Sequence, residues 1–316
     1  MAWFSKAAKE IPAAHLGYDI NSTGDGVVIK RYTGSESELN IPALIEGFPV
    51  KEIDNLDYNS KKKNPVTSII VPAGVTSFSV SEYEKLRTVT LPTGVIKVSI
   101  FKCGKLDTIT LPDSVREVSF YGSGTYGDDL KFLSLPEGVT SVSFSRCASL
   151  GTIILPGSVT KIPAYAFSDC TSLRAITLSD NITEIGEHAF LNCTSLLAII
   201  LPKNLKQFCY SDKYCNVFEG CTRLVSVTFQ SDIEEIPRRT FDGCTALKTL
   251  NINGNIGSID GSYDNAFSHC SNLTTVNIGA NVTKIGDVDA LINAGGSEGN
   301  HLSLASKAAL TKFREA

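Results

Sequence analysis

Residues 173–193 read LRAITLSDNITEIGEHAFLNC, and residues 150–170 follow the same frame with LGTIILPGSVTKIPAYAFSDC. Each copy has an alternating L-x-x-I-x-L segment, a second aliphatic pair, the dipeptide Ala-Phe and a closing Cys. The frame begins at Leu150, Leu173 and Leu196, a spacing of 23 residues. A period of this length indicates a solenoid built from stacked coils.

One such coil cannot be stable alone. Period 2 in residues 173–178 sends Ile176 and Leu178 to the same side, so this segment is predicted to be a short strand. Seven inner side chains at about 1.5–3 kcal/mol each do not offset the ordering of a whole coil at about 1–2 kcal/mol per residue. We therefore predict a right-handed α/β repeat solenoid, in which stacked coils pair these strands as a parallel β-ladder on one face.

The two halves of the chain differ on the outer side of the coil. Steps of 20 residues separate the coils that begin at Val66, Leu86 and Leu106, three residues fewer than in the later frame. In the short coils the outer segment alternates, as in Val-Ser-Phe, which predicts short convex strands in the N-terminal half. Segments such as Pro-Ala-Tyr-Ala-Phe predict short helical or 3-10 turns in the C-terminal half.

These patterns divide the chain into four parts. Residues 1–16 are predicted to be a lead-in segment, disordered or weakly helical, and residues 17–38 an N-terminal capping hairpin. Residues 39–293 form the array of about eleven coils, and residues 294–316 a glycine-rich turn followed by a C-terminal capping helix.

Composition excludes several partners. A formal charge of -4 and a pI near 5.7 argue against nucleic acid and anionic membrane surfaces. No run approaches the roughly 18 apolar residues of a spanning helix, so membrane insertion is not expected. No apolar stretch follows Lys6 and Lys9, so the chain is expected to be cytosolic or to have lost an export signal. We expect a monomer without cofactor or metal.

The nine cysteines separate into two groups. Cys209 and Cys215 lie in an inserted loop, where a disulfide is one possibility and a metal site would need two further ligands. The other seven share one repeat position. Bridges between neighbouring coils are geometrically conceivable, but buried structural thiols are the simpler interpretation. These seven are Cys103, Cys147, Cys170, Cys193, Cys221, Cys244 and Cys270.

The outward positions of the predicted ladder are the natural ligand surface. Most are small hydroxyl or β-branched residues, which stacked strands also prefer for structural reasons. A few positions break this pattern with an apolar or a basic side chain, as interface anchors do. The candidate ligand-binding residues are Phe132, Ile154 and Ile200, with Arg87, Lys131, Arg174 and Lys248 along one edge.

Motifs that could indicate catalysis do not form a convincing site. Gly122–Gly127 spells G-x-G-x-x-G but leads toward another strand rather than a helix. The basic run Lys61–Lys63 is interpreted as a solvated turn rather than a phosphate site. His188 with Cys193, and His269 with Cys270, combine residue types of thiol enzymes, yet Cys is the repeated core position. We predict that the chain is not an enzyme and has no catalytic residues.

The frame resembles that of the BspA-like, or Treponema pallidum type, leucine-rich repeats of bacterial and protist surface proteins. Residues 150–193 fit it closely, residues 39–53 (LNIPALIEGFPVKEI) resemble its usual opening, and the likeness covers about residues 18–290. The resemblance implies a leucine-rich repeat fold, and adhesion or host and matrix binding at a cell surface or in secreted form, with a protein or glycan ligand. The alternative is a cytoplasmic scaffold or sensor that binds a protein partner, which the missing signal and the thiols favour.

Overall fold

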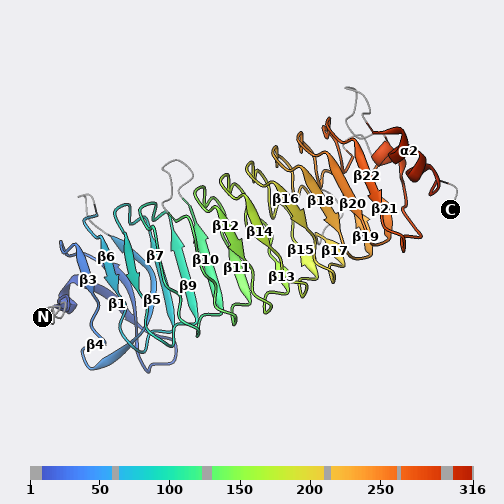
Figure 1. The fold of residues 1–316 in the computed structure, drawn as a ribbon. Helices are drawn as coiled ribbons and strands as arrows, with labels where there is room; N and C mark the ends of the chain where they lie inside the picture. Colours follow the sequence, from blue (N-terminus) through green and yellow to red (C-terminus); the bar gives the residue numbers. More distant parts are fainter. Residues whose placement is uncertain are drawn as a thin grey trace, which may run out of the picture. The chain divides into compact units, whose positions relative to one another are not determined.

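A computed structural model describes residues 9–58, 64–122, 130–209, 215–261, 265–292 and 302–314. The chain divides into two compact units, residues 1–138 and residues 139–316. Both are built from short parallel strands, with few helices (Figure 1). The predicted solenoid of stacked coils with parallel strands is therefore present in each unit.

The first unit begins with a hairpin. After the 3-10 turn η1 (Ala13–His15), β1 (Leu16–Ile20) pairs antiparallel with β2 (Val27–Tyr32). β2 then pairs parallel with β5 (Phe48–Tyr58), which itself pairs antiparallel with the short β4 (Leu44–Ile45). Ile11 is buried, and its N–H donates to the carbonyl of Asn40 at 2.9 Å. Packing of the segment before the hairpin thus starts at Ile11, within the part predicted as a lead-in.

The coils of the first unit carry two ladders. The first ladder contains β3 (Glu38–Asn40), β6 (Ser68–Ile70) and β8 (Thr88–Thr90). The second continues from β5 through β7 (Ser77–Ser81), β9 (Lys97–Phe101) and β10 (Glu117–Tyr121). These outer strands are the alternating segments of the short coils, and Phe78, Val80, Val98 and Ile100 point into the core.

In the second unit the first ladder follows the repeat frame. β12 (Thr152–Ile154) pairs with β14 (Ala175–Thr177), and a parallel sheet joins β16 (Ala198–Ile200), β18 (Ser226–Phe229), β20 (Thr249–Ile252) and β22 (Thr275–Ile278) (Figure 1). Thr152 lies opposite Ala175, and Ser226 opposite Thr249. This is the register expected from the frame, because a slip by one residue would turn the inner aliphatic side chains outward.

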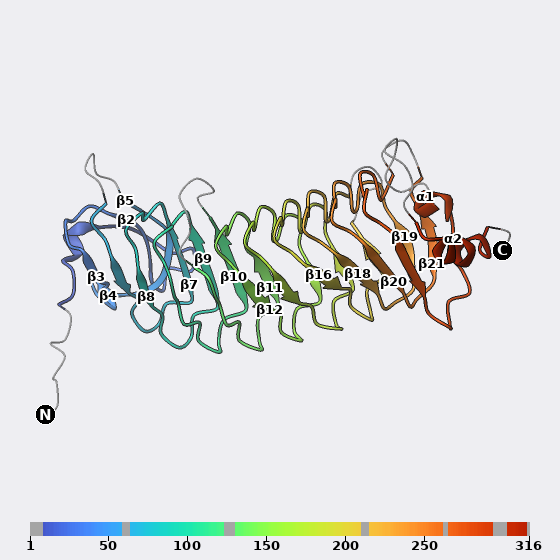
Figure 2. The ribbon, with the colours of Figure 1, turned by 45° about the horizontal axis from the view of Figure 1, so that its top comes forward.

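A second ladder lies on the other side of these coils (Figure 2). It contains β11 (Ser141–Ser143), β13 (Lys161–Ile162), β15 (Glu184–Ile185) and β17 (Gln207–Phe208), followed by β19 (Ile233–Ile236) and β21 (Ile256–Ile259). The core fills the space between the two ladders. Its largest side chains include the phenylalanines of the Ala-Phe position, stacked with ring centroids 5.1–5.6 Å apart. They are Phe144, Phe167, Phe190, Phe218, Phe241 and Phe267.

The prediction of short helical or 3-10 turns in these coils is wrong. Residues 163–170 form consecutive turns in which N–H groups alternate between two kinds of acceptor. Ala166 N–H bonds within the coil to Pro163, whereas Phe167 N–H donates to Ala189 of the next coil at 2.8 Å. Tyr165 and Asp169 have φ of 59°. A helix would keep all of these bonds inside one coil, while this left-handed alternation directs every second N–H to the neighbour.

The chain ends in two short helices, α1 (Asp289–Ile292) and α2 (Leu304–Thr311). Ser303 caps α2 by accepting from the N–H of Ser306. The Ser306 hydroxyl in turn accepts from the N–H of Val276 at 3.0 Å, and Leu310 is buried, so α2 covers the free edge of β22 (Figure 1). Over the described part of the chain, no helix has the length and apolar character to span a bilayer.

Candidate ligand-binding site

The first ladder of the second unit presents a column of residues at the point where the chain enters each strand. Backbone hydrogen bonds stack the column members one coil apart. Val225 N–H donates to Leu197 at 2.8 Å, and Lys248 N–H to Val225 at 2.9 Å. The complete column, in order, is Gly151, Arg174, Leu197, Val225, Lys248 and Thr274. Arg174 and Lys248 therefore lie on either side of Leu197 and Val225.

The two central members of this column are apolar and exposed. Leu197 retains 42% and Val225 43% of its accessible surface. The sequence pattern indicated Arg174 and Lys248 as candidate binding residues but not the two residues between them. The signal was present in the sequence, because Leu197 and Val225 follow the first Leu of their coils, the position at which Arg174 and Lys248 occur.

Ile154 and Ile200 lie in the column of the last outward residue of each strand. They are 69% and 60% exposed, among the highest values for large apolar residues of the protein. Thr177 separates them, since Ile154 pairs with Thr177 and β14 is followed by β16. Ile200 is the last residue of β16, and Leu197 directly precedes the same strand. We call Ile154, Arg174, Leu197, Ile200, Val225 and Lys248 the ladder patch.

The remaining sequence-predicted residues lie in the first unit. Phe132 is 69% exposed, and Lys131 and Arg87 are also exposed. Phe132 forms an isolated β-bridge rather than a strand, and residues 108–110 of the preceding coil form no strand, so the ladder prediction is wrong for residues 108–110 and holds at Phe132 only as a single bridge. Exposed Asp107 occupies the position equivalent to Arg87 and Lys131 in the coil between them. This edge is therefore of mixed charge.

Part of the ladder's polar surface has a structural role. Asn251 Nδ2 donates to Thr228 Oγ1 at 3.0 Å, and Asn277 Nδ2 donates to Asn251 Oδ1 at 2.9 Å. These bonds continue the column of Ile154 and Ile200 toward the C-terminal end. The structural interpretation of small polar ladder residues therefore holds for Thr228, Asn251 and Asn277, whereas Ile154 and Ile200 occupy the same column as exposed apolar residues.

The seven repeated cysteines are unbridged and buried. The thiol of Cys193 donates to the carbonyl of Phe167 at 3.1 Å, and Cys244 donates likewise to Phe218 at 3.2 Å. Burial raises the pKa of both thiols well above its usual range. A thiolate nucleophile is thereby disfavoured at these positions. His188, which shares a coil with Cys193, stacks on Tyr165 with ring centroids 4.7 Å apart.

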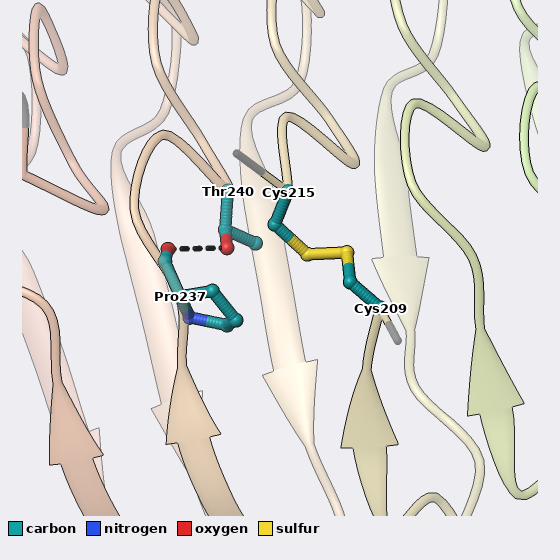
Figure 3. The surroundings of a disulfide bond; sticks show 4 residues. All are labelled: Cys209, Cys215, Pro237 and Thr240. Atoms are coloured by element: carbon teal, nitrogen blue, oxygen red, sulfur yellow. Dashed lines mark hydrogen bonds between the residues drawn. A yellow bond between two sulfur atoms is a disulfide. The ribbon is translucent and has the colours of Figure 1, made fainter. Parts of the chain in front are cut away.

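Cys209 and Cys215 form a disulfide (Figure 3). Both residues are buried, at 7% and 1% exposure, and their Cα atoms lie 5.8 Å apart. The bridge closes the inserted loop of the coil that begins at Leu196. Of the two alternatives that the sequence left open for these cysteines, a disulfide and a metal site, the structure has the disulfide. Residues 210–214 of this loop lie outside the described residues.

A cavity of about 600 Å³ lies near the C-terminal end of the second ladder. Four carboxylates line it, from Glu235, Asp260, Asp287 and Asp289, and Arg314 Nε donates to Asp289 at 2.8 Å. None of the sequence-predicted residues contributes to it. Across the described ranges, His, Cys, Asp and Glu side chains form no group of three suited to a metal ion. Most of the Gly122–Gly127 motif and all of Lys61–Lys63 fall outside the described residues.

Comparison with solved structures identifies leucine-rich repeat proteins. A leucine-rich cell surface protein of Faecalibacterium prausnitzii is 21% identical, with 90% of this chain and 80% of that chain covered at a TM-score of 0.50. A leucine-rich repeat protein of Bacteroides ovatus is 19% identical, with 86% of this chain and 89% of that chain covered at a TM-score of 0.45. The T. pallidum leucine-rich repeat protein is 20% identical, with 97% of this chain and 96% of that chain covered at a TM-score of 0.27. A comparison with curated proteins finds no significant match.

A family model gives the more specific result. The model of the BspA type leucine-rich repeat region matches the chain in six copies, over residues 49–124, 119–212 and 212–288. These stretches include every coil that carries the ladder patch. The chain belongs to the BspA type leucine-rich repeat family.

Proposed function

We propose that this protein is a non-enzymatic binding module that recognises a protein ligand through the ladder patch, in adhesion or host interaction at a microbial cell surface. The observation that carries the proposal is the exposure of four large apolar side chains on one short stretch of parallel ladder. Ile154, Leu197, Ile200 and Val225 are each 42–69% exposed. Clustered apolar residues with basic residues beside them have the anatomy of an interface centre.

The neighbouring ladder offers a comparison within the same protein. Toward the C-terminal end, Thr228, Asn251 and Asn277 satisfy one another by hydrogen bonds. The apolar members of the patch gain nothing comparable from their exposed positions, because an exposed aliphatic side chain forfeits its burial energy. A partner that covers them would recover this energy. Functional use therefore accounts for the patch better than ladder packing does.

Two observations support a location outside the cytosol. The Cys209–Cys215 disulfide is of the kind that persists in oxidising compartments. The similar protein of F. prausnitzii is described as a cell surface protein. The seven free thiols do not oppose this location, because burial protects them from oxidation.

The cytoplasmic scaffold remains the second candidate, and the free thiols are the observation that favours it. Mass spectrometry of the protein from its native cells, alkylated without prior reduction, distinguishes the two. A bridged Cys209–Cys215 pair on surface-exposed protein supports the first proposal. Reduced cysteines in a cytosolic fraction would support the scaffold.

The binding test compares matched charge insertions. The purified chain is screened against immobilised host and matrix proteins and against a glycan array. Leu197→Glu and Ile200→Glu should each weaken protein binding by about tenfold or more. Leu304→Glu is the control, because Leu304 is 87% exposed on α2 and the chemical change is the same.

Loss of binding in the two patch variants, with the control unchanged, supports the proposal. Glycan binding that both patch variants retain would show that the ligand is a glycan and that its site lies outside the ladder patch. Protein binding that Leu197→Glu and Ile200→Glu leave intact would reject the ladder patch.

A further inference from the structure

The ladder face of the second unit has no negative charge among its outward residues. From β12 to β22 these positions carry two cations, Arg174 and Lys248, and exposed Arg223 lies two residues before Val225. The other outward positions are uncharged: Gly151, Thr152, Ile154, Ala175, Thr177, Leu197, Ala198, Ile200, Val225, Ser226, Thr228, Thr249, Asn251, Thr274, Thr275 and Asn277. A ligand on this face therefore meets positive charge at both ends of an apolar centre.

Some other cations of the same coils are matched by carboxylates. Lys161 Nζ lies 2.9 Å from a carboxylate oxygen of Glu184, and Lys203 Nζ lies 2.9 Å from Asp180. Within the described ranges, Arg174 and Lys248 take part in no such ion pair, and both are exposed. Contacts between neighbouring coils thus neutralise Lys161 and Lys203, whereas Arg174 and Lys248 stay available to a ligand.

The spacing of the two cations limits the ligand further. Arg174, Leu197, Val225 and Lys248 are linked by three successive backbone hydrogen bonds, one for each coil step. Strands in a ladder are about 4.7–4.9 Å apart, so the two basic positions are roughly 14 Å apart along the stack. An extended peptide advances about 3.3–3.4 Å per residue and directs residues i, i+2 and i+4 to the same side. Its residues i and i+4 are therefore about 13–14 Å apart, the same span.

We propose that the ligand is an extended acidic protein segment of the pattern (Asp/Glu)-x-Φ-x-(Asp/Glu), where Φ is apolar. The segment runs along the stack and crosses the strands. Its first and last residues pair with Arg174 and Lys248, and Φ packs on Leu197 and Val225. This inference rests on the proposed function, since it assigns a partner class to the ladder patch.

A display library tests the pattern directly. Short Ser- and Thr-rich peptides carry a central Leu, with the residues two before and two after it randomised. Selection on the intact chain should enrich Asp or Glu at both randomised positions. Selection on the double variant Arg174→Glu/Lys248→Glu should enrich Lys or Arg there instead.

A synthetic peptide with Glu at both positions then measures the effect by fluorescence anisotropy. The double reversal should weaken its binding by up to about 30-fold, the upper value for two exposed ion pairs together. Lys206→Glu should change the affinity less than about twofold, because exposed Lys206 precedes β17 on the second ladder.

The outcomes separate the two proposals. Uncharged or basic residues enriched on the intact chain, in peptides that Leu197→Glu no longer retains, overturn the acidic pattern but leave the ladder patch as the binding site. Peptides that bind Leu197→Glu and the intact chain equally overturn both.

Discussion

A close approach between two neighbouring coils at Gly186 tests how strictly the coils are spaced. Gly186 directly follows β15 and has ordinary negative φ, so any residue could adopt its backbone conformation. A Cβ there would lie 2.5 Å from the backbone N of Ala164 and 2.8 Å from the carbonyl carbon of Pro163, against the 3.4 Å at which ordinary contact begins. Both atoms belong to the backbone of the preceding coil, which cannot rotate away as a side chain could.

Gly186→Ala therefore has to separate two stacked coils locally. Overpacking of this kind costs about 1–3 kcal/mol. The same movement stretches the 2.8 Å hydrogen bond from Gly186 N–H to Ile162, and a buried amide without its partner costs about 1–3 kcal/mol more. We expect a total destabilisation of roughly 2–6 kcal/mol.

Two other glycines serve as controls. A Cβ on exposed Gly157 would meet only Asn181 Nδ2 at 3.6 Å, so Gly157→Ala should be neutral or stabilising by about 0.4–1 kcal/mol. Gly243 has φ of +69°, and its nearest Cβ contact is at 3.7 Å. Gly243→Ala therefore isolates left-handed strain, about 1–2 kcal/mol, without a clash.

Urea unfolding followed by far-UV circular dichroism measures the three variants. Midpoints are compared first, because repeat arrays need not unfold in two states. The urea midpoint should be highest for Gly157→Ala, lower for Gly243→Ala and lowest for Gly186→Ala. A Gly186→Ala midpoint equal to that of Gly157→Ala would refute the reasoning, since the coils would then be free to adjust their spacing.

Three further predictions concern the core. Phe190→Leu should destabilise more than Phe267→Leu, by about 0.5–1.5 kcal/mol in urea unfolding, because Phe190 stacks on two rings and Phe267 on one ring of the described stack; equal losses would contradict a contribution from stacking. Thiol titration of the unreduced protein should detect seven thiols after denaturation and nine once reductant is added, and nine without reductant would exclude the disulfide. Burial raises the pKa of Cys193 and Cys244 above the usual value of 9.0, so the unfolded state loses these protons at lower pH than the folded state does. Stability should therefore fall as pH rises above about 9, by up to about 1.4 kcal/mol per pH unit for each thiol. Urea midpoints that stay level from neutral to alkaline pH would contradict this.

The ladder register could be derived from the sequence because it depends on local alternation. Ile176 lies between outward Ala175 and Thr177, and any slip would exchange these faces. The frame also predicted one shared environment for the repeated cysteines, which are all buried. The position of the binding patch was only partly accessible, since the basic residues were recognised without the apolar pair between them.

The outer turns could not be derived in the same way. Residues such as Pro163–Phe167 have the composition of a helical turn, and their local preferences do not include the next coil. Their geometry depends on bonds such as that from Phe167 to Ala189, between residues of different coils. Non-local hydrogen bonds outweighed local propensity at this point.

The sequence by itself determined that this chain is a stack of coils, because a 23-residue frame with one apolar face has no stable form other than repetition. Only the tertiary structure decided which outward residues act together. Arg174, Leu197, Val225 and Lys248 are spread over four coils, and hydrogen bonds between successive coils place them in one column. Leu197 and Val225 stay exposed there because they precede the strands, outside the alternation that buries Ile199 and Val227.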